Sequence, residues 1–335
     1  MFKTRSRARF RAKTAVALAA SSAAALLFAA PNHALAQRVT GIDVSEWQGD
    51  LQQTTWNNVK AEGRSFAFIR SSRGGSTGYY NQSDAWNELR RNTLSQRFDD
   101  RYFETNAARA VTAGLYIGPY HFSRQDVYTN STGTTKYGDG AQAQGTPTLS
   151  TAWFNYGDVA NTGADEARHF LQQAGPWMKP GYLLPVYDFE AGERQLNATQ
   201  QSVFSVAFAN TILASRGIQT ICYVNQNYAI NEADATLPAA MPINWVARWP
   251  NQADPDVIDI HNIDPPPSPS TANVYGQWYP AGQPYPTPQP WKFWQYGSSN
   301  TNVGGITPVD VDVAHGDIEY LKEMLVPALW TKTTT

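Results

Sequence analysis

Two carboxylates stand two residues apart at the end of an apolar segment, in the stretch LLPVYDFEAG at positions 183–192. If this segment is a strand, Asp188 and Glu190 lie on one side of it and Phe189 on the other, because side chains alternate along a strand. Crowding raises the pKa of at least one of the two acids and lowers the stability of the fold. We therefore expect the pair to have a function. A pair with one protonated and one charged acid suits the hydrolysis of a glycosidic bond.

Further acids follow other strand-like segments. Asp43 comes after VTGI, and Asp310 lies in TPVDVDVAHG. A single acid at a strand end usually caps a turn or a helix, but four in uncharged apolar surroundings are harder to explain in that way. Carboxyl groups about 5 to 5.5 Å apart suit a reaction that retains the anomeric configuration, and wider spacing suits inversion. We therefore expect a carboxylate site if these strand ends meet.

Other chemistries have weaker support. No HExxH, GxSxG, P-loop or GxGxxG pattern is present, and we predict no metal and no cofactor. The histidines after residue 36 are too far apart to suggest a zinc site; they are His121, His169, His261 and His315. His121 in PYHFSR is more often a hydrogen-bonded core residue than a base. Asp310 and Asp312 alone are poor evidence for a cation site.

The order of strand-like and helix-like segments predicts the fold. The segments that read as strands are VTGIDVSEW, SFAFIRSS, GLYIGPYHFSR, YLLPVYDFE, QTICYVN, INWVARW and KFWQYGS. Between them, residues 164–175 and 200–217 carry apolar residues at helical spacing and end in Gly175-Pro176 and Gly217. This alternation indicates an α/β fold, and seven or eight strands suggest a TIM-like barrel with its active site at the carboxyl ends of the strands. Less helix separates the last strands, so we expect an irregular barrel.

The first 36 residues have the pattern of a secretory signal peptide. Six Lys or Arg residues precede an Ala- and Leu-rich run, and an A-x-A cleavage site stands at 34–36. No other segment approaches the roughly 18 apolar residues of a membrane span. We therefore predict a secreted or periplasmic protein without a permanent membrane span, made of a signal peptide at 1–36 and one catalytic domain at 37–335.

Charge and cysteine content exclude further classes. Removal of residues 1–36 leaves 20 basic against 28 acidic residues, whereas a nucleic-acid-binding protein would be basic. Cys222 is the only cysteine, cannot form an internal disulfide, and is expected to be buried. The chain must then be stabilised by a large core. We also expect a monomer.

Two segments interrupt the alternation of strands and helices. Residues 124–163 are rich in Gly, Thr, Ser and Asn, and residues 262–290 hold nine prolines interleaved with Tyr and Trp. Both are interpreted as long loop insertions, which such compositions often leave disordered. The aromatic residues of the second insertion leave open that it packs on the barrel rim and helps to hold a polymer.

Five blocks resemble the glycoside hydrolase family 25 lysozymes, the Chalaropsis-type N-acetylmuramidases: GIDVSEWQG, GLYIGPYHFS, PVYDFE, INWVARW and FWQYGS…VDVDVAHG. The resemblance covers residues 38–325 and implies a (β/α)5(β)3 barrel that cleaves the β-1,4 bond between N-acetylmuramic acid and N-acetylglucosamine in peptidoglycan strands. By position, Glu190 resembles the general acid and Asp188 the carboxylate that stabilises positive charge. Asp43 and Asp310 resemble the supporting acids.

Arg70 and four aromatic residues are expected to contact the substrate. The family usually has a Lys where this chain has Arg70. Tyr120, Trp249 and Trp294 follow or end predicted strands and should reach the mouth of the barrel, and Tyr187 adjoins the two acids. The alternative is that Tyr120 and Trp294 only fill the barrel core.

Two functions remain open. The first is a secreted muramidase that retains the anomeric configuration, and the second is a non-catalytic protein that binds cell-wall glycan on the same barrel. A chitinase-type barrel is disfavoured because its D-x-D-x-E pattern needs an acid where Val186 stands. An inactive relative is expected to lose an acid, and this chain keeps all four, which favours the muramidase.

Overall fold

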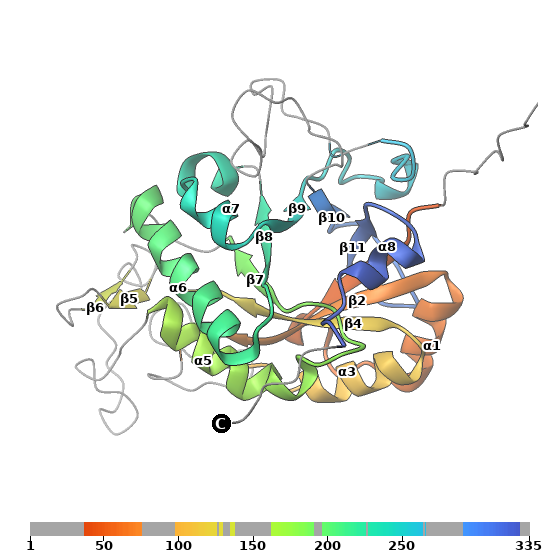
Figure 1. The fold of residues 1–335 in the computed structure, drawn as a ribbon. Coiled ribbons are helices and arrows are strands. Elements are labelled where there is room, and N and C mark those ends of the chain that lie inside the picture. The colour runs from red at the N-terminus through yellow and green to blue at the C-terminus, as the bar shows by residue number, and fades with distance from the viewer. Residues whose placement is uncertain are drawn as a thin grey trace, which may run out of the picture. The chain divides into compact units, whose positions relative to one another are not determined.

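Eight β-strands form a closed barrel (Figure 1). They are β1 (Thr40–Val44), β2 (Arg64–Arg73), β4 (Tyr116–Phe122), β7 (Val186–Phe189), β8 (Ile221–Asn225), β9 (Ile243–Ala247), β10 (Trp291–Gly297) and β11 (Asp310–Ala314). The computed structural model describes residues 37–75, 98–125, 127–129, 135–137, 162–190, 196–225, 227–263, 265 and 291–328. All of these belong to one compact unit, Ala36–Thr335.

The strand order explains why the barrel is irregular. Around the barrel the order is β1-β2-β4-β7-β8-β9-β10-β11, and β11 returns to β1. Neighbours are parallel from β1 to β10, whereas β11 is antiparallel to both β10 and β1. The short strand β3 (Phe98–Asp99) extends the sheet beside β2. The predicted α/β barrel with an irregular final part is confirmed.

Helices cover the first part of the barrel. The longer ones are α1 (Gln53–Ala61), α3 (Phe103–Thr112), α5 (Gly163–Ala174) and α6 (Ala198–Arg216), and Figure 1 shows them following one another around the sheet. The shorter ones are η1 (Glu46–Gln48), η3 (Gly175–Trp177), η4 (Tyr228–Glu232), α7 (Thr236–Ala240), η5 (Pro255–Val257) and α8 (Ile318–Glu323).

Local sequence explains both ends of α6. The Asn197 side chain accepts a hydrogen bond from the Gln200 backbone, and the Gln200 side chain accepts one from the Asn197 backbone, both at 3.0 Å. This capping box satisfies N–H groups that the first turn leaves free. Gly217 ends the helix with a left-handed φ of 68°. The predicted helices at 164–175 and 200–217 are therefore confirmed, with α6 starting a few residues earlier because of its cap.

The two faces of each strand serve different layers. Inside the barrel, the rings of Phe68 and Trp245 stack at 4.5 Å, and Phe293 lies 5.0 Å from Phe68. Outside, Tyr187 of β7 lies 4.5 Å from Phe208 of α6. Burial of one such side chain contributes about 1.5–3 kcal/mol. The interior of the barrel is therefore filled by packed aromatic rings.

Some predicted segments lie outside the described residues. They are the predicted signal peptide, most of residues 124–163, and nearly all of residues 262–290. Within the first insertion, β5 (Val127–Thr129) pairs antiparallel with β6 (Thr135–Tyr137). In the described part of the chain, no helix has the length and apolar character of a membrane span.

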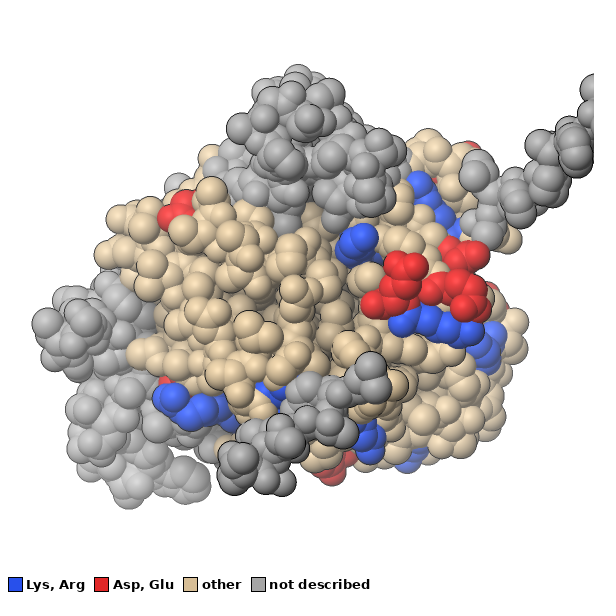
Figure 2. Space-filling model, in the orientation of Figure 1, with Lys and Arg blue, Asp and Glu red and all other residues tan. Residues whose placement is uncertain are grey.

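Charged side chains are unevenly distributed on the face shown in Figure 2. The area over α6 is mostly uncharged, while basic and acidic groups gather near α8. On that helix, Lys322 and Glu319 form an ion pair at 2.7 Å. The charges on this face are therefore mixed in sign rather than gathered into a basic patch.

Candidate active site

A cavity of about 210 Å³ opens at the carboxyl ends of the parallel strands. All four predicted acids line it: Asp43 on β1, Asp188 on β7, Glu190 directly after β7, and Asp310 at the start of β11. Because β11 runs antiparallel to β1, its first residue lies at the end where β1 finishes. Among the described residues, no group of three or more His, Cys, Asp or Glu side chains could hold a metal ion.

Strand alternation sets the direction of the first acid pair. Asp188 and Glu190 line the cavity, whereas Phe189 between them packs on the outside, 5.2 Å from the ring of Tyr228. Burial raises the pKa of Glu190 to about 7, although Tyr223 and Arg70 act to lower it. A carboxyl that still holds its proton near neutral pH can donate it to a leaving oxygen.

The second acid pair faces across the barrel seam. Asp43 and Asp310 are direct partners in the antiparallel register of β1 and β11. Burial and the neighbouring Asp43 raise the pKa of Asp310 to about 9. Burial likewise raises the pKa of Asp188 well above its usual value, and repulsion from Glu190 adds to this. These acids therefore cannot all be ionised at neutral pH.

Arg70 supplies positive charge at the cavity wall. Its guanidinium lies 3.4 Å from the Glu46 carboxylate and 3.5 Å from that of Asp100. Asp100 is itself fixed by the backbone N–H of Glu46 at 2.7 Å. The charge of Arg70 lowers the pKa of Asp188, against the larger effects of burial and the neighbouring acids. Arg70 therefore lines the cavity as expected and also moderates the charge of the acids.

Two of the predicted aromatic residues are at the cavity. Tyr120 from β4 and Trp249 after β9 both line it. Tyr120 is largely buried, with only 8% of its surface exposed, and its ring centroid lies 6.5 Å from that of Trp245. It is therefore part of both the cavity wall and the core. Trp249 donates its indole N–H to the Gln295 side-chain oxygen at 3.0 Å.

The other two predicted aromatic residues lie elsewhere, and this corrects the expectation. Trp294 is 0% exposed and donates its indole N–H to the Arg248 carbonyl at 2.6 Å. Its neighbour Gln295 lines the cavity, so alternation turns Trp294 outward. Tyr187 turns away from Asp188 for the same reason, and its hydroxyl donates to Ser123 at 2.9 Å.

Sequence reasoning missed several residues of the cavity. Trp47 stands on η1 just after β1 and is 64% exposed. Its position four residues after Asp43 was a signal, because a strand-end loop beside an acid reaches the same mouth. Gln295, Tyr223 and Trp245 also line the cavity. Their roles depend on contacts between strands that no single segment of sequence reveals.

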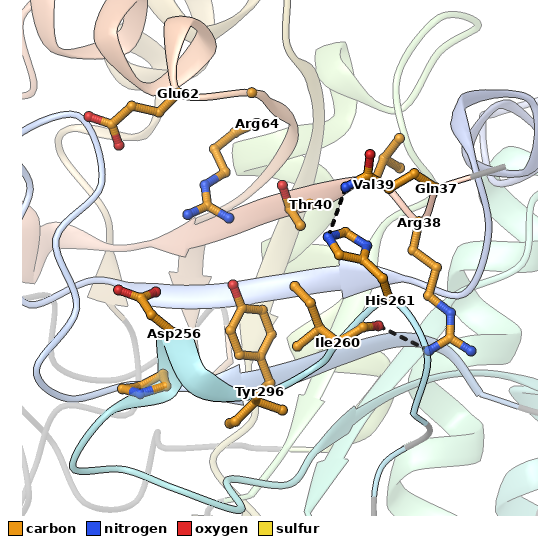
Figure 3. Close-up of a pocket in the computed structure, with 13 residues that line it drawn as sticks. Gln37, Arg38, Val39, Thr40, Glu62, Arg64, Asp256, Ile260, His261 and Tyr296 are labelled. Carbon is orange, nitrogen blue, oxygen red and sulfur yellow. Dashed lines mark hydrogen bonds between the residues drawn. The ribbon is translucent and has the colours of Figure 1, made fainter. Parts of the chain in front are cut away.

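A second, larger cavity lies beside the barrel (Figure 3). It measures about 530 Å³ and is lined by Arg64, Glu62, Asp256, His261 and Tyr296, among others. Its wall is held by the hydrogen bonds of Gln37 to His261 at 3.1 Å and of Arg38 to the Ile260 carbonyl at 3.0 Å. None of the predicted acids lines this lateral cavity, so the smaller carboxylate cavity is the candidate active site.

An acid-lined cavity at the carboxyl ends of the barrel strands suits the paired-carboxyl chemistry of a glycoside hydrolase. Residues 124–306, more than half of the chain, match the family described as "Glycosyl hydrolases family 25". The chain therefore belongs to glycosyl hydrolase family 25. The matched span includes Asp188 and Glu190; Asp310 lies four residues after it, and Asp43 lies far before it.

Individual relatives are similar to this chain in sequence or in fold. Lysozyme M1 of Streptomyces globisporus is 26% identical over 282 residues, which cover 82% of this chain and 66% of that protein, just under two thirds of its length. The bacterial lysozyme of Streptomyces coelicolor shares the fold with a TM-score of 0.54 and 22% identity, over 87% of this chain and 98% of that one. A family 25 glycosyl hydrolase of Bacillus anthracis has a TM-score of 0.52 and 17% identity, over 87% and 97% of the two chains.

Proposed function

We propose that this protein is a secreted muramidase that acts as a monomer. It hydrolyses the β-1,4 bond between N-acetylmuramic acid and N-acetylglucosamine in peptidoglycan, with retention of configuration. The observation that carries the proposal is a buried Glu190, with a pKa raised to about 7, beside Asp188 in an acid-lined cavity. The name of the relative Lysozyme M1 supports the same activity.

The two acids have different roles in the proposed reaction. Glu190 donates its proton to the oxygen of the leaving sugar. Asp188 stabilises the positive charge that develops at the anomeric carbon. In the favoured route the 2-acetamido group of the substrate attacks, and Asp188 stabilises the cyclic oxazolinium; in the other route Asp188 attacks directly. Both routes retain the β configuration.

Aromatic residues and Arg70 are proposed to hold the glycan. Trp249 and Tyr120 line the carboxylate cavity, and the exposed Trp47 stands at its edge. The flat rings of Trp and Tyr can pack against the apolar faces of sugar rings. The indole N–H and the phenol O–H of these side chains can form hydrogen bonds with sugar hydroxyl groups. Arg70 presents a fixed positive charge to an anionic group of the substrate.

Digestion of purified cell walls tests the proposal. We expect a loss of turbidity and new reducing ends that carry muramic acid, as identified by mass spectrometry. NMR of the first product should show the β-anomer, whereas an initial α-anomer would exclude both routes. Turnover of a substrate without the N-acetyl oxygen at an undiminished rate would leave Asp188 as the nucleophile. Wall binding without new reducing ends would support the non-catalytic alternative.

A further inference from the structure

Two adjacent acids at the end of β3 point in opposite directions. Asp99 accepts a hydrogen bond from the Gln173 side chain at 3.0 Å and lies 2.6 Å from a ring nitrogen of His169, and both partners belong to α5. Asp100 contacts η1 and β2 instead. Both acids are buried, and neither lines the carboxylate cavity. Of the two, Asp100 is therefore the acid that contacts the segments at the rim of this cavity.

Each side-chain oxygen of Asp100 accepts a backbone hydrogen bond. One oxygen accepts from the Glu46 N–H at 2.7 Å, and the other accepts from the Tyr102 N–H at 3.1 Å. The Nε atom of Arg70 lies 3.5 Å from the first oxygen. Burial raises the pKa of Asp100, and the Arg70 charge and the two N–H groups act to lower it. An amide could satisfy only one N–H group, because its NH2 would face the other, so this position requires the two acceptor oxygens of a carboxyl group.

The Glu46 N–H belongs to the first residue of η1, the short helix that carries Trp47. The first N–H groups of a helix have no partner within the helix. Ser45 satisfies one of them, because its side chain accepts from the Trp47 N–H at 3.3 Å. Asp100 satisfies the Glu46 N–H from another part of the chain. Asp100 therefore ties the beginning of η1 to the end of β3.

The segment that follows η1 is held separately by α3. The Asn106 side chain donates to the Gly49 carbonyl at 2.9 Å and accepts from the Leu51 N–H at 3.0 Å. These two hydrogen bonds do not involve Asp100. Loss of the Asp100 contact should therefore displace η1 without releasing the segment behind it.

Two residues next to the Asp100 contacts line the carboxylate cavity. Trp47 follows Glu46 on η1, and Arg70 lies on β2. The Arg70 guanidinium is also 3.4 Å from the Glu46 carboxylate and 5.4 Å from the ring centroid of Phe98 on β3. Asp100 thus joins the backbone of η1 to the wall that carries Arg70. A displacement of η1 would change the place of Trp47 relative to this wall.

We propose that Asp100 is a positioning residue for glycan binding, which holds η1 against the cavity wall and thereby keeps Trp47 in place at the rim. The inference rests on the proposed function, in which Trp47 contacts the glycan. It deepens that proposal, because it names an acid outside the cavity that determines part of the binding surface. Asp100 does not touch the proton donor Glu190, so its effect falls on KM and not on kcat.

The first test compares the two adjacent acids. Asp100→Asn places an amide NH2 against a backbone N–H, so KM on cell walls should rise roughly two- to fivefold while kcat stays within about twofold of the wild type. Asp99→Asn is the matched control, because it makes the same change toward α5 and should lower Tm without raising KM. An equal rise of KM in both variants would mean that a general loss of stability is the cause, and would overturn the inference.

A second pair of variants removes the same hydrogen bond from the other side. Glu46→Pro lacks the N–H that Asp100 accepts, and proline is well tolerated at the first position of a helix. Glu46→Ala keeps this N–H, and both variants lose the carboxylate beside Arg70. KM should therefore be higher in Glu46→Pro than in Glu46→Ala. Equal KM values would contradict the inference, and this pair keeps the test decisive if Asp100→Asn does not fold.

A double-variant cycle shows whether Asp100 acts through Trp47. In a Trp47→Ala protein the side chain to be positioned is absent, so Asp100→Asn should raise KM no further. A rise as large as in the wild-type background would reject the proposed role of Asp100.

A spectroscopic measurement tests the position of Trp47 without any reaction. In protein labelled with 5-fluorotryptophan, the ¹⁹F signal of Trp47 is assigned with Trp47→Phe. This signal should shift in Asp100→Asn and stay unchanged in Asp99→Asn. An unmoved Trp47 signal in Asp100→Asn would overturn the inference. If the wild type does not lyse walls, the proposed function fails, while this measurement still tests whether Asp100 positions Trp47.

Discussion

The two cavities of this protein differ in how strongly their charged side chains destabilise the fold. The lateral cavity is more than twice as large, about 530 against 210 Å³, and its wall mixes Arg38 and Arg64 with Glu62 and Asp256. The carboxylate cavity gathers four acids around Arg70, and burial raises the pKa of Glu190 and Asp310. Buried like charges, rather than size, therefore distinguish the candidate active site.

The buried acids of the carboxylate cavity lower the stability of the fold when they ionise. A carboxyl whose pKa is higher in the folded than in the unfolded chain weakens the fold whenever it is ionised. Glu190 and Asp310 both have this property. A cavity wall with no function would gain stability by losing such groups, so their presence argues for a reaction.

The largest expected difference between the cavities is in catalysis. Glu190→Gln removes the proton donor and keeps the shape of the side chain, so kcat on cell walls should fall by about two to four orders of magnitude. Turbidity assays give the rate, and circular dichroism checks that the variant folds. Near-wild-type lysis by a folded Glu190→Gln protein would reject Glu190 as the acid.

The pH dependence of stability should come from the carboxylate cavity. The raised pKa values of Glu190, about 7, and Asp310, about 9, mean that the folded chain binds these protons more tightly than the unfolded chain. Their stabilisation is complete below about pH 4 and is lost as the pH rises through these values. We expect Tm to fall by about 5 °C or more between pH 5 and pH 9.

A variant shows whether the cavity causes that slope. Asp310→Asn cannot ionise, so its Tm should change less between pH 7 and pH 9 than that of the wild type. Calorimetric scans in matched buffers measure both proteins. Parallel Tm curves would show that the slope has another origin.

Substitutions at the cavity rim and in the core should have different, smaller effects on KM and on stability. Trp47 is 64% exposed at the carboxylate cavity, so Trp47→Ala should raise KM on walls several-fold, on the order of 1 kcal/mol, with little change in Tm. The matched control is Trp294→Ala, which empties a fully buried position and should cost roughly 3–5 kcal/mol of stability. A large fall in Tm for Trp47→Ala with an unchanged KM would contradict this division.

The smallest effect is expected in the lateral cavity. Asp256 is exposed there and lines no part of the carboxylate cavity. Asp256→Ala should therefore leave kcat/KM on cell walls within about twofold of the wild type. Asp310→Ala is the matched change in the other cavity. A loss in Asp256→Ala as large as in Asp310→Ala would mean that the two cavities do not act separately.

Much of the site follows from strand geometry alone. Parallel strand ends meet at one edge, which is why Asp43, Asp188 and Glu190 were expected together, and the antiparallel last strand brings Asp310 to the same place. The same alternation argument, applied to Tyr187, would have turned it away from Asp188.

Other parts of the site depend on packing. In KFWQYGS apolar residues face both inward and outward, so the sequence does not reveal that Trp294 points outward while Gln295 points into the cavity. The link from Gln295 to Asp43 joins residues 252 positions apart and exists only in the closed barrel. Such contacts have no local signature in the sequence.

The seam between β1 and β11 also determines when the site comes into existence. Synthesis delivers Asp43 long before β11, and β1 and β11 pair directly. Until β11 is made, β1 has one unpaired edge and Asp43 lacks its partner Asp310. Closure of so long a loop is late and slow compared with the local helices. We therefore expect a chain that ends before β11 to lack the assembled group of four acids.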